Sequence, residues 1–254
     1  MPGRVSTLSA VAGALMGLFT LTSGPSKGAD TDMCRELAAA DIEQLKGRQA
    51  VVIDIDGVLT KYFLLDYGRT NGAFLDQGVA YARADAALML NIYHRRGYAI
   101  VYMAGRPRQL EVLGKSMCQA TLDWLESNGF PIERGDTLLL LRDGASSVMD
   151  AQDRGTAMAE WMGGHGTKLF ASMVNGVKQE LGLVPVYGYV DSDVVTDAFL
   201  EVGVPARHIF TIGNKGITRL GYRGSHAIVG PGANPGFTEH VRQFVVPDVR
   251  AAAQ

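Results

Sequence analysis

Residues 50–60 read AVVIDIDGVLT, and this stretch predicts both a fold and a chemical site. Its apolar, β-branched start is typical of a strand that is buried on both faces of a parallel sheet. Asp54 and Asp56 stand at the end of that strand, separated by one residue, and Gly57 then allows the chain to turn. The alternative is an ordinary Asp-Gly turn, but a DxDG run directly after a buried strand favours a site.

The chemistry of this pair follows from its predicted burial. Carboxylates that leave an apolar strand are costly unless a proton or a cation accompanies them. Mg²⁺ suits such a pair because it is a hard cation that prefers oxygen ligands. One carboxylate can then attack a phosphorus atom, while the other donates a proton to the leaving oxygen and later activates water.

The rest of the chain from residue 49 onward alternates apolar runs with helical patterns. Strands are predicted at 50–55, 98–103, 137–141, 184–190 and 208–212, and helices at 82–95, 107–128, 168–181 and 193–201. This alternation predicts an α/β fold, a doubly wound parallel sheet with right-handed crossovers. Ligands of such sheets bind beyond the carboxyl ends of the strands, so the site is expected there.

Composition and charge limit the classes of function that the chain can have. The chain has 254 residues, of which 47% are hydrophobic and 20% charged, so it can bury a substantial core. Its formal net charge of −2 argues against a nucleic-acid partner, which would call for a basic surface. Nothing in the sequence indicates an oligomeric state.

The first residues differ from the rest. Arg4 precedes an uncharged stretch, residues 5–22, and small residues follow it up to residue 28. This order is typical of a secretory signal peptide at residues 1–28; an uncleaved membrane anchor and a buried helix are the alternatives. The first two readings predict an exported protein, periplasmic or secreted, with a lead segment at 29–48 and the main domain at 49–245. Cys34 and Cys118 are the two cysteines, and they are predicted either as one disulfide or as two unpaired thiols.

Three segments carry a resemblance to a known superfamily. VVIDIDGVLT is similar to the first motif of haloacid dehalogenase (HAD) phosphatases. Together with VYMAGRPRQ and VYGYVDSDVVTDAFLEVGVPARHIFTIGNKG, it resembles the lipin/Ned/Smp (LNS2-type) phosphatidate phosphatase domain and the related domain of Nir/RdgB phosphatidylinositol-transfer proteins. The resemblance implies a Rossmann-like sheet with strand order 3-2-1-4-5, and the short stretch 64–76 leaves room only for a minimal cap.

The resemblance also implies roles for single residues. Asp54 matches the nucleophile, and Asp56 matches the general acid/base that also binds Mg²⁺ through its backbone carbonyl. Lys168, predicted at the start of a helix, matches the lysine that neutralises the nucleophile and the phosphate; the alternative is an exposed lysine. Asp191 in the DSD run, which is also similar to class B acid phosphatases, matches a direct Mg²⁺ ligand. Asp193 or Asp197 is left as an indirect one, although Asp197 could equally be a charge on a helix surface.

Two positions depart from the family pattern. Ala104 stands where a serine or threonine is expected to hold the phosphoryl oxygen. The phosphate would then depend on Ala104, Gly105 and Arg106, mainly through the backbone N–H groups of Gly105 and Arg106 at the start of the following helix. Arg106 could equally be a solvated turn residue. Val195 occupies the place of the final aspartate of the class B run.

The sequence therefore predicts an exported, Mg²⁺-dependent phosphomonoester hydrolase that forms an aspartyl-phosphate and acts on a phosphate ester such as the phospholipid phosphatidate. A soluble acid phosphatase of broad specificity is one alternative. A catalytically weak phospholipid-sensing module of Nir/RdgB type is the other; Ala104 and Val195 favour it, whereas the retained Asp54 and Asp56 favour the enzyme.

Overall fold

The computed structural model describes residues 43–60, 82–108, 111–112, 115–133, 135–142, 166–212, 221–229 and 235–252. The segments that were predicted as signal or anchor and as cap, residues 1–28 and 64–76, lie outside these ranges, as does most of the lead segment. Among the residues that the structure describes, no helix is both long and apolar enough to cross a bilayer.

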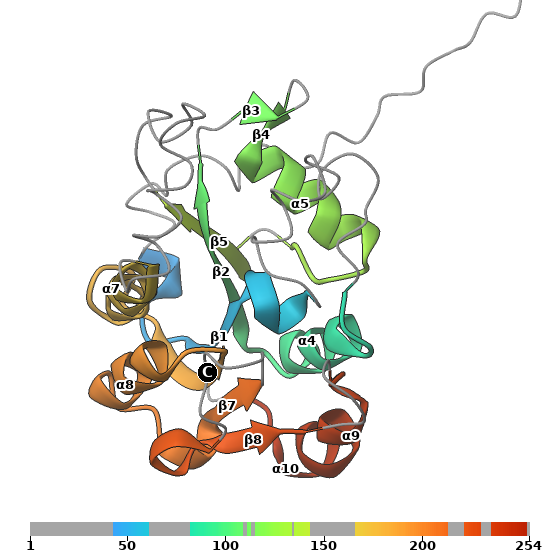
Figure 1. Ribbon diagram of the computed structural model, residues 1–254, viewed down its shortest axis with the longest axis vertical. Helices are drawn as coiled ribbons and strands as arrows, with labels where there is room; N and C mark the ends of the chain where they lie inside the picture. Colours follow the sequence, from blue (N-terminus) through green and yellow to red (C-terminus); the bar gives the residue numbers. More distant parts are fainter. Residues whose placement is uncertain are drawn as a thin grey trace, which may run out of the picture.

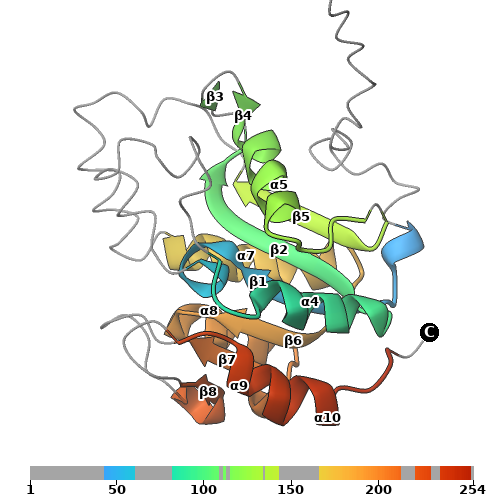
Figure 2. The same cartoon turned by 90° about the vertical axis from the view of Figure 1, so that its right-hand side faces the viewer.

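A six-stranded sheet, in which every adjacent pair of strands is parallel, forms the centre of the molecule (Figures 1 and 2). Its strands, in spatial order, are β5 (Thr137–Arg142), β2 (Ala99–Pro107), β1 (Gln49–Asp54), β6 (Val184–Val190), β7 (Ile209–Ile212) and β8 (His226–Ile228). The first five strands give the expected order 3-2-1-4-5, and β8 adds a further strand at the edge. The predicted doubly wound α/β class is therefore confirmed.

Helices cover both faces of this sheet (Figure 1). The described helices are α4 (Ala86–Arg95) and α5 (Met117–Ser127) on one face, α7 (Gly166–Gln179) and α8 (Asp193–Glu201) on the other, and the short C-terminal turns α9 (Thr238–His240), Val241–Val245 and α10 (Val246–Asp248). Single turns of tighter helix occur at Ala206–His208 and Tyr222–Gly224, and a small antiparallel pair joins β3 (Glu111–Val112) to β4 (Lys115–Ser116).

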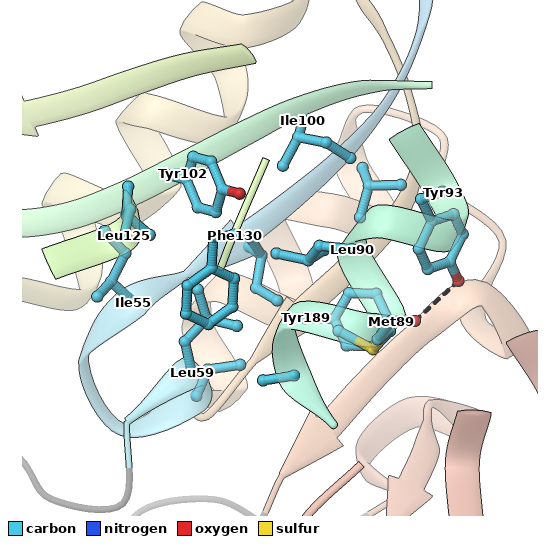
Figure 3. Packing of buried hydrophobic residues seen from close by; sticks show 14 of the residues in the cluster. Ile55, Leu59, Met89, Leu90, Tyr93, Ile100, Tyr102, Leu125, Phe130 and Tyr189 are labelled. Carbon is cyan, nitrogen blue, oxygen red and sulfur yellow. Dashed lines mark hydrogen bonds between the residues drawn. The ribbon is translucent and has the colours of Figure 1, made fainter. Parts of the chain in front are cut away.

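Alternating side chains of the central strands separate two hydrophobic cores. Val51 and Ile53 of β1 face the core under α4 and α5, whereas Ala50 and Val52 face the core under α7 and α8. All four side chains are fully buried, which explains why β1 reads as a continuous apolar run. Figure 3 shows the first core, where Tyr93 and Leu90 of α4 pack beside residues of the sheet.

The predicted helix over residues 107–128 is wrong in its first half. β2 continues to Pro107, the β3–β4 pair follows, and α5 begins only at Met117. The physical reason for this start is the side chain of Ser116, which accepts a hydrogen bond from the backbone N–H of Gln119 at 3.2 Å and so caps the helix.

Cys118 lies in the first turn of α5 and is buried. It is disulfide-bonded, which agrees with the first of the two readings of the cysteines. Cys34, the other cysteine of the chain, lies outside the described residues.

Candidate active site at the carboxyl edge of the sheet

The end of β1 forms a tight loop that carries two buried carboxylates. Asp54 is the last residue of β1, and Asp54 and Asp56 each expose 5% of their surface. The backbone N–H of Asp56 donates to Oδ1 of Asp54 at 3.2 Å, which orients that carboxylate. Gly57 has a φ of +82°, a value that favours glycine, and it turns the chain directly after Asp56.

The loop closes on itself through Thr60. The backbone N–H of Gly57 donates to Oγ1 of Thr60 at 3.0 Å, and the backbone N–H of Thr60 donates to the carbonyl of Ile55 at 3.1 Å. We call residues 54–60 the catalytic loop, after the role expected for Asp54 and Asp56. Because Thr60 is fully buried, these bonds are shielded from water and fix the loop.

Asp191 reaches the same edge from the neighbouring strand. It follows β6, which pairs with β1, and it is buried. The pKa of Asp191 is raised to about 7, first by burial and then by the nearby Asp56 carboxylate, against the lowering effect of the Arg83 guanidinium. The Oδ2 atom of Asp191 is buried and has no hydrogen-bond partner. A buried, unpartnered carboxylate oxygen beside a second carboxylate is an environment that a cation would stabilise.

Arg83 is a buried arginine that hydrogen-bonds to this loop, and nothing in the sequence predicted its role there. It exposes 2% of its surface, and burial lowers its pKa to about 10, while Asp191 acts in the opposite direction. The sequence pattern placed Arg83 in the first turn of a helix over 82–95, but α4 begins only at Ala86, after Asp85 in the left-handed region. No spacing or motif in the sequence distinguishes this arginine from an exposed one.

The predicted phosphate-binding residues lie at the end of β2, beside the nucleophile position. Asp54 pairs with Met103 in the sheet, so Ala104 and Gly105 come directly after the residue beside Asp54. Both are buried, and the methyl group of Ala104 belongs to the hydrophobic core under α4 and α5. Gly105 and Arg106 both belong to β2, so the predicted helix start at these residues is wrong: the strand continues to Pro107. The side chain of Arg106 is outside the described part of the structure.

The two remaining predicted residues lie at helix starts. Lys168 is in the first turn of α7, and its side chain is not among those that the structure describes. Asp193 is the first residue of α8, partly exposed, two residues beyond Asp191. On the same helix, Asp197 forms an ion pair with Arg223 at 2.9 Å.

A second group of possible metal ligands lies at the opposite end of the sheet. His94, Glu133 and Asp136 place one ligand atom each within 4.8 Å of the others. They precede the starts of β2 and β5, whereas the predicted site lies beyond strand ends. Within the described ranges, Asp54, Asp56 and Asp191 do not form such a side-chain group.

The sequence family described as PITM 1-3, LNS2 domain, matches residues 51–213. This match covers more than half of the chain and includes the ends of β1, β2 and β6. A search of curated proteins finds no significant match to the chain.

Several solved structures resemble the chain at low identity. One is the Pnkp1/Rnl/Hen1 RNA repair complex, with 18% identity over 65% of this chain and 42% of that one, at a TM-score of 0.40. A HAD-like phosphatase from Mesorhizobium loti has 12% identity over 70% of this chain and 78% of that one, at a TM-score of 0.41. The HAD domain of the effector Lem4 from Legionella pneumophila has 12% identity over 78% of this chain and 95% of that one, at a TM-score of 0.38. The chain spans less than half the length of the first, and at these TM-scores none of them carries an argument about function.

Proposed function

The chain belongs to the LNS2 domain family, and from this membership and the site at the end of β1 we propose that it is a Mg²⁺-dependent phosphomonoester hydrolase. One observation carries the proposal. A buried carboxylate with an unpartnered oxygen, Asp191, comes to the same sheet edge as Asp54 and Asp56. A structural role would not need buried carboxylates that repel each other, as Asp191 and Asp56 do, because this repulsion costs stability.

Asp54 is the proposed nucleophile. Its position at the end of a central strand holds it rigidly, and the N–H of Asp56 fixes the orientation of its carboxylate. A carboxylate oxygen of Asp54 attacks the phosphorus of the ester, the bond to the leaving oxygen breaks, and an aspartyl-phosphate forms.

Asp56 is the proposed general acid and base. It donates a proton to the leaving oxygen in the first step. In the second step it takes a proton from water, which attacks the aspartyl-phosphate and releases inorganic phosphate, restoring the Asp54 carboxylate. Gly57 supports this role because its positive φ turns the chain immediately after Asp56.

The residues at this edge fit a Mg²⁺ ion. The carboxylates of Asp54 and Asp191 and the backbone carbonyl of Asp56 would hold it, with Asp193 as an indirect contributor. The donor set is all oxygen, and the unpartnered Oδ2 of Asp191 is an atom that such an ion would satisfy. When bound, Mg²⁺ supplies charge neutralisation for the carboxylates and for the phosphate oxygens.

The phosphoryl group also needs donors from the protein. The proposed ones are the backbone N–H groups of Gly105 and Arg106, at the irregular end of β2, together with the Lys168 ammonium. Ala104 supplies no hydroxyl, and the loss of one positioned donor is expected to slow turnover by about 10²–10³-fold.

We place the substrate among phosphate monoesters, with a phospholipid such as phosphatidate as the first choice and soluble esters as the second. Family membership supports the lipid. The uncharged stretch at residues 5–22 supports export of the protein, with the N-terminus as a cleaved signal or a membrane anchor.

A catalytically weak phospholipid-sensing module is the second candidate. Ala104 favours it, because its buried methyl group belongs to the apolar core and brings no donor to the phosphate. Such a module would bind the lipid headgroup at the same edge but would release no phosphate.

Phosphate release from phosphatidate vesicles and from a soluble aryl phosphate, each with and without Mg²⁺, tests the proposal. We expect Mg²⁺-dependent release by the unmodified protein and a loss of about 10³-fold or more in Asp54→Asn, because the amide is a poor nucleophile. Asp123→Asn is the matched control, since Asp123 lies on α5 and pairs with Lys115.

The outcomes separate the candidates. Turnover near that of the unmodified protein in Asp54→Asn would exclude covalent catalysis at this residue. Vesicle binding without any phosphate release would favour the sensing module.

A further inference from the structure

Arg83 is a buried cation for which the proposed chemistry has no direct use, yet it contacts the catalytic loop. Its Nη2 donates to the carbonyl of Gly57 at 2.8 Å, and its backbone N–H donates to the carbonyl of Leu59 at 2.8 Å. Gly57 directly follows Asp56, so the guanidinium holds the turn that positions the acid/base. Hydrogen bonds from a buried guanidinium are stronger than those between neutral groups.

The same guanidinium also contacts the C-terminal part of the chain. Nη1 of Arg83 donates to the carbonyl of Pro235 at 2.7 Å. We call residues 235–252 the C-terminal strap; they lie beyond the family match, which ends at residue 213. Arg83 therefore joins a loop that the family defines to a segment outside the family match.

The strap packs closely against the backbone beside Arg83. A Cβ atom placed on Gly236 would lie 2.9 Å from Cβ of Ala84 and 3.2 Å from its carbonyl oxygen. The backbone N–H of Phe237 donates to that same carbonyl at 2.8 Å, and the Phe237 side chain is fully buried. This contact leaves no space for a side chain at position 236, so glycine allows the strap to pack directly on residues 83–84.

We propose that Arg83 is a positioning residue through which the C-terminal strap fixes the catalytic loop. The inference rests on the proposed function for the meaning of that loop, but its physical content is the rigidity of residues 54–60. Electrostatics adds to the geometry, because the guanidinium attracts Asp191 and so offsets part of the repulsion between Asp191 and Asp56.

The chain offers a matched control in Arg96. Its guanidinium also binds strap carbonyls, those of Val245 and Val249 at 2.5 Å each and that of Val246 at 2.9 Å. Arg96 follows α4 at the end remote from Arg83, and its guanidinium has no hydrogen bond to the catalytic loop among the described contacts. Loss of Arg96 should therefore loosen the far end of the strap, residues 245–249, and leave the bond between Arg83 and Pro235 in place.

Amide hydrogen exchange of peptides from residues 54–60, measured on the full chain without substrate or Mg²⁺, tests the proposal directly. We expect Arg83→Met to speed this exchange by about 10-fold, the equivalent of one charge-assisted hydrogen bond. Gly236→Ala should do the same through steric displacement of the strap, with Arg83 itself retained. Arg83→Lys should be intermediate, because an ammonium can reach one of the two carbonyls but not both.

A second readout concerns the ion. Titration calorimetry with Mg²⁺ alone should show weaker binding in Arg83→Met and Gly236→Ala, by about 10-fold, if the loop holds the backbone carbonyl of Asp56 in place. Arg96→Met should lower the melting temperature but leave both the loop exchange and the Mg²⁺ affinity unchanged.

Two results would overturn the proposal: unchanged exchange of residues 54–60 in the Arg83 variants and Gly236→Ala, or an equal increase in Arg96→Met. If Arg83→Met does not fold, Arg83→Lys and Gly236→Ala still give the measurement. Failure of the proposed function is a separate result, namely no phosphate release by the unmodified protein, and it leaves the exchange experiment intact.

Discussion

Strand β6 places two buried polar side chains in opposite situations. The hydroxyl of Tyr189, within the strand, lies 2.8 Å from the hydroxyl of Tyr93 and 2.9 Å from Nε2 of His240. Asp191, just beyond the strand, has a buried Oδ2 atom without a hydrogen-bond partner. The Tyr189 hydroxyl is therefore satisfied inside the core, whereas one oxygen of Asp191 is left without a partner at the sheet edge where ligands bind.

The paired region is built from aromatic rings on three elements. Tyr93 comes from α4, Tyr189 from β6 and His240 from α9, and Figure 3 shows the bond between the two tyrosines as a dashed line. Phe210 stacks on Tyr189 with ring centroids 4.8 Å apart. Such a network specifies one arrangement of the C-terminal strap, because each hydroxyl requires its partner.

The largest effect among these substitutions is expected at Asp191, on the affinity for Mg²⁺. Asp191→Asn should weaken Mg²⁺ binding by about 10–100-fold, because an amide is a poorer ligand than a carboxylate. The same substitution should stabilise the metal-free protein, since it removes the repulsion between Asp191 and Asp56. Calorimetric titration and denaturant unfolding measure the two effects.

An unchanged Mg²⁺ requirement in Asp191→Asn would contradict the metal role. The N-cap residue of α8 is Ser192, so capping of this helix does not offer a competing role for Asp191. Asp193→Asn serves as the comparison, and it should have the smaller effect.

The next largest effect is expected at Tyr189, on the stability of the protein. Tyr189→Phe leaves the Tyr93 hydroxyl and Nε2 of His240 without the partner between them. We expect the free energy of unfolding to fall by about 1–3 kcal/mol, the cost of unsatisfied buried polar groups, while Mg²⁺ affinity stays the same. Tyr102→Phe is the control. The Tyr102 hydroxyl donates a hydrogen bond of 2.8 Å to the carbonyl of Pro131, and losing this bond should cost less stability than losing the Tyr189 hydroxyl.

A weakened Mg²⁺ affinity in Tyr189→Phe would contradict the separation of the two regions. It would mean that the aromatic network, like Arg83, helps to position the catalytic edge.

The sequence predicts the unpaired region better than the paired one. Asp54, Asp56 and Asp191 follow apolar strands at once, so their shared edge follows from parallel topology alone. The network of Tyr93, Tyr189 and His240 joins residues far apart in the chain, and tyrosines in apolar patterns look the same whether paired or not. Their partners depend on tertiary packing, which cannot be predicted from the periodicity of the sequence.

Two other features were out of reach for a similar reason. Arg83 is charged and would be placed on a surface by composition, since arginine is seldom buried without partners. Its partners are backbone carbonyls of Gly57 and Pro235, which leave no mark on residue type. The strap itself consists of short helical turns, too brief for a periodic pattern.

The smallest expected effect is a change in how the free energy of unfolding depends on pH, and it comes from His240. Burial, and after it the neighbouring His226, lowers the pKa of His240 to about 3. In the unfolded chain a histidine has a pKa of about 6.5, so the unfolded state binds a proton at higher pH than the folded state does. The stability from this histidine is therefore complete above pH 6.5 and is lost progressively as the pH falls towards 3.

His240→Gln should flatten this profile, because glutamine keeps a polar contact with Tyr189 but does not titrate. Between pH 6.5 and 5.5, His240 alone should cost the unmodified protein about 1 kcal/mol in the free energy of unfolding, and the variant should not show that loss. Urea unfolding at a series of pH values gives the two slopes. Equal slopes would mean that His240 binds a proton equally well in the folded and unfolded states, and the buried network would then admit a charge. The two polar regions of β6 would in that case differ less than their hydrogen bonds indicate, since both would tolerate ionisation inside the protein.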